Sequence, residues 1–160
     1  MRDATLVFLL RGNPGSEILL GLKKSGLGEG KWNGFGGKVE DGETIERAAA
    51  RELREECGIE VDAADLRPVA RIEFYFPHKP EWDQVVHAFI AKEWRGEPKE
   101  SREMMPRWFA TNAIPYDTMW ADDRHWLPLA LQGRRVNATF TFKEDNETVD
   151  AAEIKLLDTE

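Results

Sequence analysis

Residues 44 to 58 constrain the fold most, because they describe an amphipathic helix with charged side chains in a fixed order. Ile45, Ala49 and Leu53 recur at every fourth position, which places them on one face of a helix. Gly58 supplies the left-handed residue that commonly ends a helix. The sequence therefore predicts a helix from Thr44 to Cys57 that packs one face on a core.

The other face of this helix is acidic. Glu52, Glu55 and Glu56 stand at i, i+3 and i+4, so their carboxylates share one side and repel one another by a few tenths of a kcal/mol per pair. Taken alone, such a triplet is best explained as a solvated acidic face. A hard divalent cation would reverse the repulsion, because Mg²⁺ binds carboxylate oxygens.

The segment around the helix adds two features to the acidic face. Arg51 can pair with a neighbouring carboxylate such as Glu43 and hold the preceding loop onto the helix. Gly36 and Gly37 allow the backbone to come close enough to offer a carbonyl oxygen to a metal. Both features favour a metal site over a purely structural helix.

The full pattern from Gly37 to Ile59 is G-x5-E-x7-R-E-U-x-E-E-x-G-U, where U is a bulky aliphatic residue. A chance match over this chain has odds of roughly one in ten million on average composition. The pattern matches the Nudix box, and the chain resembles the Nudix hydrolases. Its fixed positions are Gly37, Glu43, Arg51, Glu52, Glu55, Glu56 and Gly58.

This resemblance implies that metal-activated water attacks a phosphorus of a nucleoside diphosphate linked to another group. It implies Mg²⁺ as the cofactor, with Mn²⁺ as a substitute. Glu52 and Glu56 would be the principal ligands, assisted by the Gly36 carbonyl, and Glu55 would be a further ligand or the general base. Glu103, outside the box, is a candidate ligand, and an exposed loop glutamate is an equally open explanation. The identity of the base stays open.

Two further segments narrow the resemblance. Residues 32–37, Trp-Asn-Gly-Phe-Gly-Gly, and residues 120–123, Trp-Ala-Asp-Asp, are similar to the oxidised purine nucleoside triphosphate hydrolases. These MutT homologues remove 8-oxo-dGTP and 2-hydroxy-dATP from the nucleotide pool. The similarity runs over about residues 5 to 145 and fades in the last fifteen residues.

Four residues in and near these segments suit a purine. Asn33 offers both a donor and an acceptor, although it could instead be a turn residue before a glycine. Trp120 could stack on a base, worth about 1–3 kcal/mol, or simply belong to the core. Asp122 and Asp123 could cap a helix, or share one proton and so read either oxidised purine.

The resemblance also implies a set of further substrate-binding residues, which are Thr5, Leu6, Lys23, Phe35, Gly37 and Phe74. Two departures from the subgroup stand out. Leu27 occupies a position where phenylalanine is usual, and the segment from Glu81 is one residue longer, which puts Gln84 where a methionine often packs.

The resemblance predicts the Nudix fold, an α+β domain in which a mixed β-sheet lies between helices in an α/β/α arrangement, and residues 1–160 are expected to form a single domain. The remaining elements are expected as a strand pair over 5–10 and 18–23 with a turn at 12–16, strands over 69–76, 85–94 and 107–110, a helix over 122–132, and a closing hairpin over 136–142 and 149–157.

Composition restricts partners and location. The net charge of −8 disfavours stable binding to nucleic acid but permits a small anionic nucleotide beside a metal. Cys57 is the only cysteine, which suits a reducing compartment, and the apolar run from Leu6 to Leu10 is too short for a signal or a membrane span. We expect a cytoplasmic monomer.

The leading hypothesis is magnesium-dependent hydrolysis of oxidised purine (deoxy)nucleoside triphosphates to the monophosphate and pyrophosphate, which would sanitise the nucleotide pool. The alternative is a Nudix pyrophosphatase for ADP-ribose, a dinucleoside polyphosphate or an unmodified nucleotide. A non-catalytic nucleotide-binding module is a third possibility, and the intact set of box glutamates argues against it.

Overall fold

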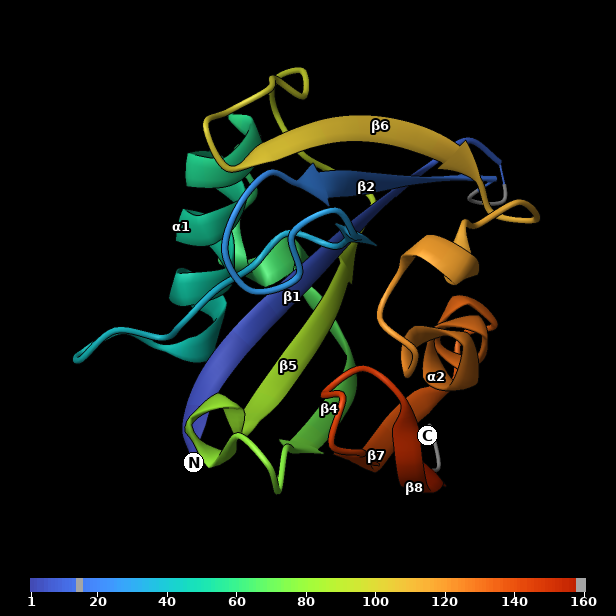
Figure 1. Ribbon diagram of the computed structural model, residues 1–160. Helices are drawn as coiled ribbons and strands as arrows, with labels where there is room; N and C mark the ends of the chain where they lie inside the picture. The colour runs from blue at the N-terminus through green and yellow to red at the C-terminus, as the bar shows by residue number, and fades with distance from the viewer. Residues whose placement is uncertain (14–15, 158–160) are drawn as a thin grey trace.

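The computed structural model describes residues 1–13 and 16–157 (Figure 1). Its strands and helices in chain order are β1 Arg2–Arg11, β2 Glu17–Lys23, β3 Trp32–Asn33, α1 Ile45–Cys57, β4 Arg67–Tyr75, β5 Gln84–Ala91, β6 Met104–Ala110, α2 Asp123–Leu131, β7 Arg135–Phe142 and β8 Val149–Leu157. Short 3-10 turns lie at Ala63–Asp65, Pro80–Trp82 and Tyr116–Thr118.

All the strands belong to one mixed sheet, in the order β3-β2-β1-β5-β4-β7-β8, with β6 paired to β2. β1 pairs with β5 and β4 with β7 in parallel, and the other pairs are antiparallel. The predicted pairings of β1 with β2 and of β7 with β8 are confirmed. Pro14 and Gly15, within the predicted turn between β1 and β2, lie outside the described residues.

Alternate side chains of β1 enter two separate cores, as the two-residue period of a strand requires. Val7 and Leu9 pack in the cluster that includes Leu53 of α1, whereas Phe8 and Leu10 pack in the cluster that includes Trp126 of α2. Figure 1 shows α1 and α2 on opposite sides of β1 and β5. This arrangement confirms the expected α/β/α layering.

Helix α1 begins and ends at the signals in its sequence. The Thr44 hydroxyl accepts a hydrogen bond from the Arg47 N–H (3.2 Å), so Thr44 is the N-cap and the helix starts one residue later than expected. Gly58 has a φ of 76°, and its N–H donates to the Arg54 carbonyl (2.9 Å). The two caps fix the rotation of the acidic face relative to the sheet.

Several strand boundaries differ from the sequence expectation, by up to three residues; β1, for example, begins at Arg2 rather than at residue 5. β6 begins at Met104 rather than at residue 107, because it pairs with the full length of β2 from Glu17 to Lys23. β5 ends at Ala91 rather than at Trp94. Among the described residues, we find no helix with the length and apolar character needed to cross a bilayer.

Candidate active site

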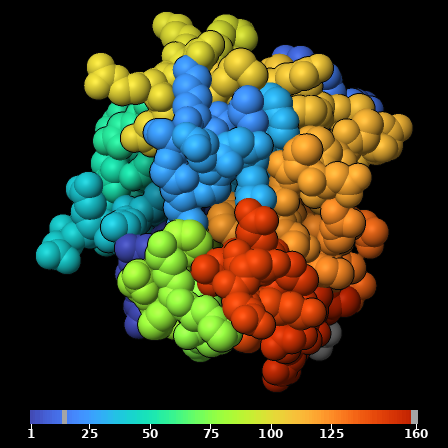
Figure 2. All heavy atoms as spheres, viewed as in Figure 1, coloured from blue at the N-terminus to red at the C-terminus, as the bar shows by residue number. Residues whose placement is uncertain are grey.

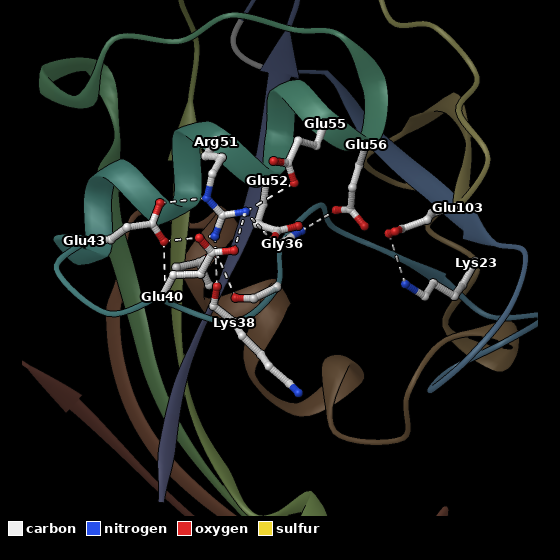
Figure 3. A network of polar contacts seen from close by, with 12 residues as sticks. Lys23, Gly36, Lys38, Glu40, Glu43, Arg51, Glu52, Glu55, Glu56 and Glu103 are labelled. Carbon is white, nitrogen blue, oxygen red and sulfur yellow. Dashed lines mark hydrogen bonds and ion pairs between the residues drawn. The ribbon is translucent and has the colours of Figure 1, made fainter.

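Arg51 organises the acidic face of α1 (Figure 3). Its Nε and one terminal nitrogen donate to the two carboxylate oxygens of Glu43, at 2.6 and 2.9 Å. Its other terminal nitrogen donates to Glu52 (2.9 Å) and Glu55 (3.2 Å). A further bond to the Lys38 carbonyl (3.1 Å) ties the loop before the helix to the same guanidinium. The expected pairing with Glu43 is therefore confirmed.

Two of the box glutamates are strained electrostatically. Burial raises the pKa of Glu56 to about 8, against the opposing effect of a hydrogen bond from the Gly36 N–H (2.7 Å). Burial also raises the pKa of Glu52, and the charges of Glu55 and Glu103 add to this rise. The charged forms of these carboxylates are therefore disfavoured in the protein alone, and a cation bound beside them would stabilise those charged forms.

The backbone around Gly36 leaves no room for a larger residue, and a side chain at Gly37 would have to displace the Glu52 carboxylate. A Cβ on Gly36 would lie 1.7 Å from the Thr5 carbonyl oxygen, and a Cβ on Gly37 would lie 2.6 Å from the Glu52 carboxyl carbon. The Gly37 carbonyl accepts from the Thr5 N–H (2.8 Å), which anchors the segment to β1. This close approach brings the Gly36 backbone to the carboxylates, as the sequence predicted.

Glu103 lies beside the box although it is distant in sequence. Its carboxylate is 3.8 Å from the Lys23 ammonium, and its charge raises the pKa of both Glu52 and Glu56. Figure 3 shows Glu103 and Glu56 on neighbouring elements with their carboxylates facing the same region. The structure thus places Glu103 near the acidic face rather than on a remote loop, and its role as a ligand stays a prediction.

The predicted ligands fit a divalent metal in chemistry. Mg²⁺ prefers oxygen ligands, which the predicted set supplies. Its positive charge would also reduce the repulsion between the carboxylates of Glu52 and Glu56. Within residues 1–13 and 16–157, however, no three acidic, histidine or cysteine side chains converge closely enough to hold an ion. The contacts explain this, because Arg51 draws Glu52 and Glu55 toward itself.

A cleft of about 300 Å³ extends from the box across the α2 face of the sheet. Glu56 of the box helix and Lys23 line it, as does Trp126 of α2. The cleft is bordered by most of the predicted substrate-binding residues, namely Thr5, Leu6, Lys23, Asn33, Gly37, Phe74, Trp120, Asp122 and Asp123. A volume of this size suits a small-molecule ligand.

Phe35 is the exception among the predicted substrate-binding residues. Its side chain is fully buried in the cluster beneath α1, with Leu53 and Ala49, and it does not line the cleft. Backbone bonds to Val7 in both directions (2.6 and 2.9 Å) fix it there. The expectation that Phe35 contacts substrate is corrected: its ring packs beneath the box helix, on the face of the sheet opposite to the cleft.

Asp122 and Asp123 are both 2% exposed and line the cleft. Asp122 accepts from the Trp126 indole N–H (2.9 Å) through one oxygen, while its other oxygen and one oxygen of Asp123 have no protein partner among the described residues. Burial raises the pKa of Asp122 to about 6 and that of Asp123 well above its ordinary range, with the Asp122 charge adding to the latter.

The contacts of Asp122 bear on the capping explanation, whereas a role of the pair in reading a base stays a prediction. Asp122 occupies the N-cap position of α2, but its side chain makes no capping hydrogen bond. The capping explanation is therefore wrong for this side chain. Two buried neighbouring carboxylates cannot both ionise cheaply, so one holds a proton and donates while the other accepts.

Asn33 and Trp120 combine structural contacts with positions in the cleft. Asn33 lies in strand β3 rather than in a turn, and its side-chain carbonyl accepts from the Gly34 N–H (2.8 Å), which leaves its NH₂ group to face other partners. The Trp120 ring packs edge-on against Phe76 at 6.3 Å. It thus contacts the core and borders the cleft at the same time.

Trp120 also borders a second hollow at the rim of the cleft. Figure 2 shows the segments around residues 25, 80 and 145 gathered on one face of the molecule. The Lys31 ammonium lies 5.4 Å from the centre of the Trp120 ring and 3.6 Å from the Glu147 carboxylate. These contacts join the loop after β2 to the turn between β7 and β8.

Sequence reasoning missed several lining residues, among them Arg2, Lys38 and Met104. Lys38 directly follows the two glycines of the box, and that adjacency could have indicated it. Arg2 and Met104 carry no motif, and only the pairing of their strands brings them to the cleft. Leu27 and Gln84, the two departures from the subgroup, both line the cleft.

The fold has α/β/α layers, and its carboxylate-bearing helix packs against a pair of glycines at one end of a cleft. These features together define a Nudix-type hydrolase. The chain belongs to the family described as the NUDIX domain, whose model matches residues 1–130.

Two curated relatives match nearly the full chain. A protein of Danio rerio named oxidized purine nucleoside triphosphate hydrolase is 49% identical over 91% of this chain and 90% of its own. A protein of the same name from Mus musculus is 45% identical over 96% of this chain and 94% of its own. Among solved structures, a MutT protein from Bacillus halodurans superposes with a TM-score of 0.79 over 96% of this chain and 97% of its own, at 22% identity, which supports the fold.

Proposed function

We propose that this Nudix hydrolase converts oxidised purine (deoxy)nucleoside triphosphates, of the 8-oxo-dGTP and 2-hydroxy-dATP type, to the monophosphate and pyrophosphate. One observation carries the proposal: the buried pair Asp122 and Asp123 leaves two carboxylate oxygens without a protein partner in the same cleft that ends at Glu56. The names of the two relatives with high identity support the same substrate class.

The aspartate pair suits oxidised purines because such bases present different hydrogen-bonding edges. Oxidation of guanine at C8 turns the N7 acceptor into an N–H donor and adds a carbonyl acceptor, whereas oxidation of adenine at C2 changes a different edge, so one rigid set of partners would reject one of the bases. A proton that moves between Asp122 and Asp123 lets the pair match either pattern without a change of backbone. The Asn33 NH₂ group adds a fixed donor, and Trp120 adds a flat surface for stacking.

The reacting phosphorus would lie at the other functional end of the cleft. We infer that Glu52, Glu56 and the Gly36 carbonyl would hold Mg²⁺, for which Mn²⁺ could substitute, and that Glu55 and Glu103 lie close enough to assist. The cation supplies Lewis acidity there: it lowers the pKa of water and offsets negative charge on phosphate oxygens. Arg51 positions the carboxylates through Glu43, and Lys23 provides a cation beside Glu103.

The acidic surface and the single cysteine bear on the type of substrate and on the cellular location. We propose that it acts on a free nucleotide rather than on a nucleic acid, as a cytoplasmic monomer. The net charge of −8 supports the first point, because an acidic surface repels a polynucleotide backbone. The single cysteine, Cys57, is buried, which is compatible with a reducing compartment.

A hydrolysis panel tests the proposal. Pyrophosphate release would be measured with magnesium for 8-oxo-dGTP, 2-hydroxy-dATP, dGTP and dATP, and monophosphate release for ADP-ribose and a dinucleoside polyphosphate. We expect kcat/KM for the two oxidised nucleotides to exceed that for their unmodified forms by about tenfold or more. A clear preference for ADP-ribose or for the dinucleoside polyphosphate would overturn the proposal in favour of another Nudix activity.

A further inference from the structure

Three neighbouring strands, β1, β5 and β4, form one wall of the cleft (Figure 1). Their pairing puts Arg2 beside Gln84 and Gln84 beside Phe74, so these three side chains share one face of the sheet. The next row of paired residues on that face is apolar throughout. We call this surface the strand wall, and its residues are Arg2, Gln84, Phe74, Ala4, Val86 and Ile72.

The strand wall reaches the part of the cleft that the proposed function assigns to the base. Phe76 directly follows β4, and its ring packs edge-on against Trp120 at 6.3 Å. The box contacts β1 at another point, where the Thr5 N–H donates to the Gly37 carbonyl. Arg2 is three residues from Thr5, which is about 10 Å along the strand. Arg2 is therefore placed with the base and away from the carboxylates of the box.

Arg2 carries a buried donor to which the proposed function gives no role. Its Nε is buried and has no hydrogen-bond partner among the described residues. Buried polar groups are nearly always paired in folded proteins, and an unpaired donor on a charged side chain costs free energy. Gln84 is the other polar residue of the strand wall, and the remaining members are apolar. Because Arg2 borders the cleft, a bound ligand can supply the missing acceptor.

We propose that Arg2, with Gln84 beside it, donates a hydrogen bond to a carbonyl oxygen of a guanine-type base and so favours guanine nucleotides over adenine nucleotides. The inference rests on the proposed function, which puts the base in this part of the cleft. A guanidinium donates hydrogen bonds and accepts none. It therefore matches the exocyclic oxygens of guanine and 8-oxoguanine, which unmodified adenine lacks. A base without such an oxygen leaves the donor unpaired, and a site built around a hydrogen bond discriminates against that base.

Steady-state kinetics on Arg2 variants test the inference with 8-oxo-dGTP, dGTP and dATP. Arg2→Met keeps a long side chain but removes the donors, and Arg2→Lys keeps the charge. Arg135→Met is the matched control, because Arg135 is exposed at the start of β7 and lies outside the cleft. We expect Arg2→Met to lower kcat/KM for the two guanine nucleotides about tenfold more than for dATP, mainly through KM. Arg2→Lys should recover part of the loss, and the control should match the wild type.

A nucleoside without phosphates separates the base from the rest of the substrate. In Arg2→Met, the inhibition constant of 8-oxo-2′-deoxyguanosine should rise about tenfold, whereas that of inorganic pyrophosphate should stay as in the wild type. Gln84→Met, which removes only the neutral amide, should have a smaller effect in the same direction. Thermal unfolding of each variant shows whether it is folded, and Gln84→Met and Arg2→Lys keep the test valid if Arg2→Met is not.

Three outcomes would overturn the inference: equal losses for dGTP and dATP in Arg2→Met, unchanged inhibition by the nucleoside, or an equal loss in Arg135→Met. The first would move the contact to the sugar or the phosphates, which all the nucleotides share. Failure of the proposed function is distinguishable from all three, because the comparison of dGTP with dATP involves no oxidised base. If the substrate panel shows no preference for oxidised purines but Arg2→Met still affects dGTP more than dATP, the Arg2 contact stands and the oxidised-purine assignment fails.

Discussion

Arg51 binds both carboxylate oxygens of Glu43, at 2.6 and 2.9 Å, across the loop that precedes the helix. The hydrogen bond from Arg51 is the main reason that the pKa of Glu43 falls to about 2. The same guanidinium contacts Glu52, Glu55 and the Lys38 carbonyl. The ion pair between Arg51 and Glu43 therefore holds the loop and the helix of the box in fixed positions relative to each other. Glu43 therefore positions the box carboxylates through Arg51.

Glu43→Gln is expected to weaken Mg²⁺ binding and kcat/KM by about 10- to 100-fold, as is typical when a group that orients metal ligands is changed. The amide would retain at most part of the bidentate contact, so Arg51 would be less firmly held. Calorimetric titration with Mg²⁺ measures the change in metal affinity, and pyrophosphate release measures the change in kcat/KM. Glu46→Gln is the matched control, because Glu46 is exposed in the first turn of α1. Wild-type metal affinity in Glu43→Gln would contradict the positioning role.

Glu56→Gln is expected to lower magnesium-dependent turnover by about 10²- to 10⁴-fold while leaving the fold intact. The Gln carbonyl can still accept from the Gly36 N–H, but the neutral side chain is a far weaker partner for a cation. Pyrophosphate release and circular dichroism measure the two effects. Glu60→Gln, at an exposed position after the helix, serves as the control. Wild-type turnover in Glu56→Gln would contradict a role for the box glutamates in catalysis.

Magnesium affinity should depend on pH through Glu56. Because burial raises the pKa of Glu56 to about 8 in the metal-free protein, a cation must displace a proton below that pH. Apparent affinity should therefore rise with pH, by up to about tenfold per unit below pH 8, and level off above it. Calorimetry in buffers of different ionisation enthalpy would also detect the released proton. A flat profile between pH 6 and pH 9 would show that Glu56 is already ionised.

The sequence was sufficient to predict the box because helical spacing converts directly into geometry. Glu52, Glu55 and Glu56 must share a face once the helix is granted, and the caps at Thr44 and Gly58 confirm that the helix forms where the pattern indicates. The adjacency of Asp122 and Asp123 likewise guaranteed a close pair. Their burial could not be predicted, since it depends on the packing of α2 onto the sheet.

The positions of Arg2 and Phe35 could not be predicted from the sequence, because they depend on contacts between segments that are distant in the chain. Arg2 carries no motif, and it reaches the cleft because β1 pairs with β5 in parallel and brings Gln84 beside it. Phe35 lies in a segment that resembles a substrate loop, yet its ring turns to the opposite side of the sheet. The orientation of one residue in an irregular, glycine-rich segment has no periodic signal. The single domain over residues 1–160 stays a prediction.

The aspartate pair, which we propose to recognise the base, also lowers the stability of the fold as the pH rises. Asp123 is buried beside Asp122, so its pKa lies well above the ordinary value of 3.8. The native state therefore binds a proton that the unfolded chain releases as the pH rises past that value. More protons bound in the native than in the unfolded state means that this group's contribution to stability falls with rising pH. An amide at the same position would not titrate and would mimic the protonated acid.

Asp123→Asn is accordingly expected to be more stable than the wild type at neutral pH and to lose that advantage toward pH 4. The same substitution should lower kcat/KM for 8-oxo-dGTP and 2-hydroxy-dATP unequally, because a fixed donor suits only one of the two bases. Urea unfolding at several pH values measures the first effect and the hydrolysis panel the second, with Asp150→Asn on exposed β8 as the control. Equal losses for both nucleotides, with no pH-dependent gain in stability, would mean that the pair does not share a movable proton.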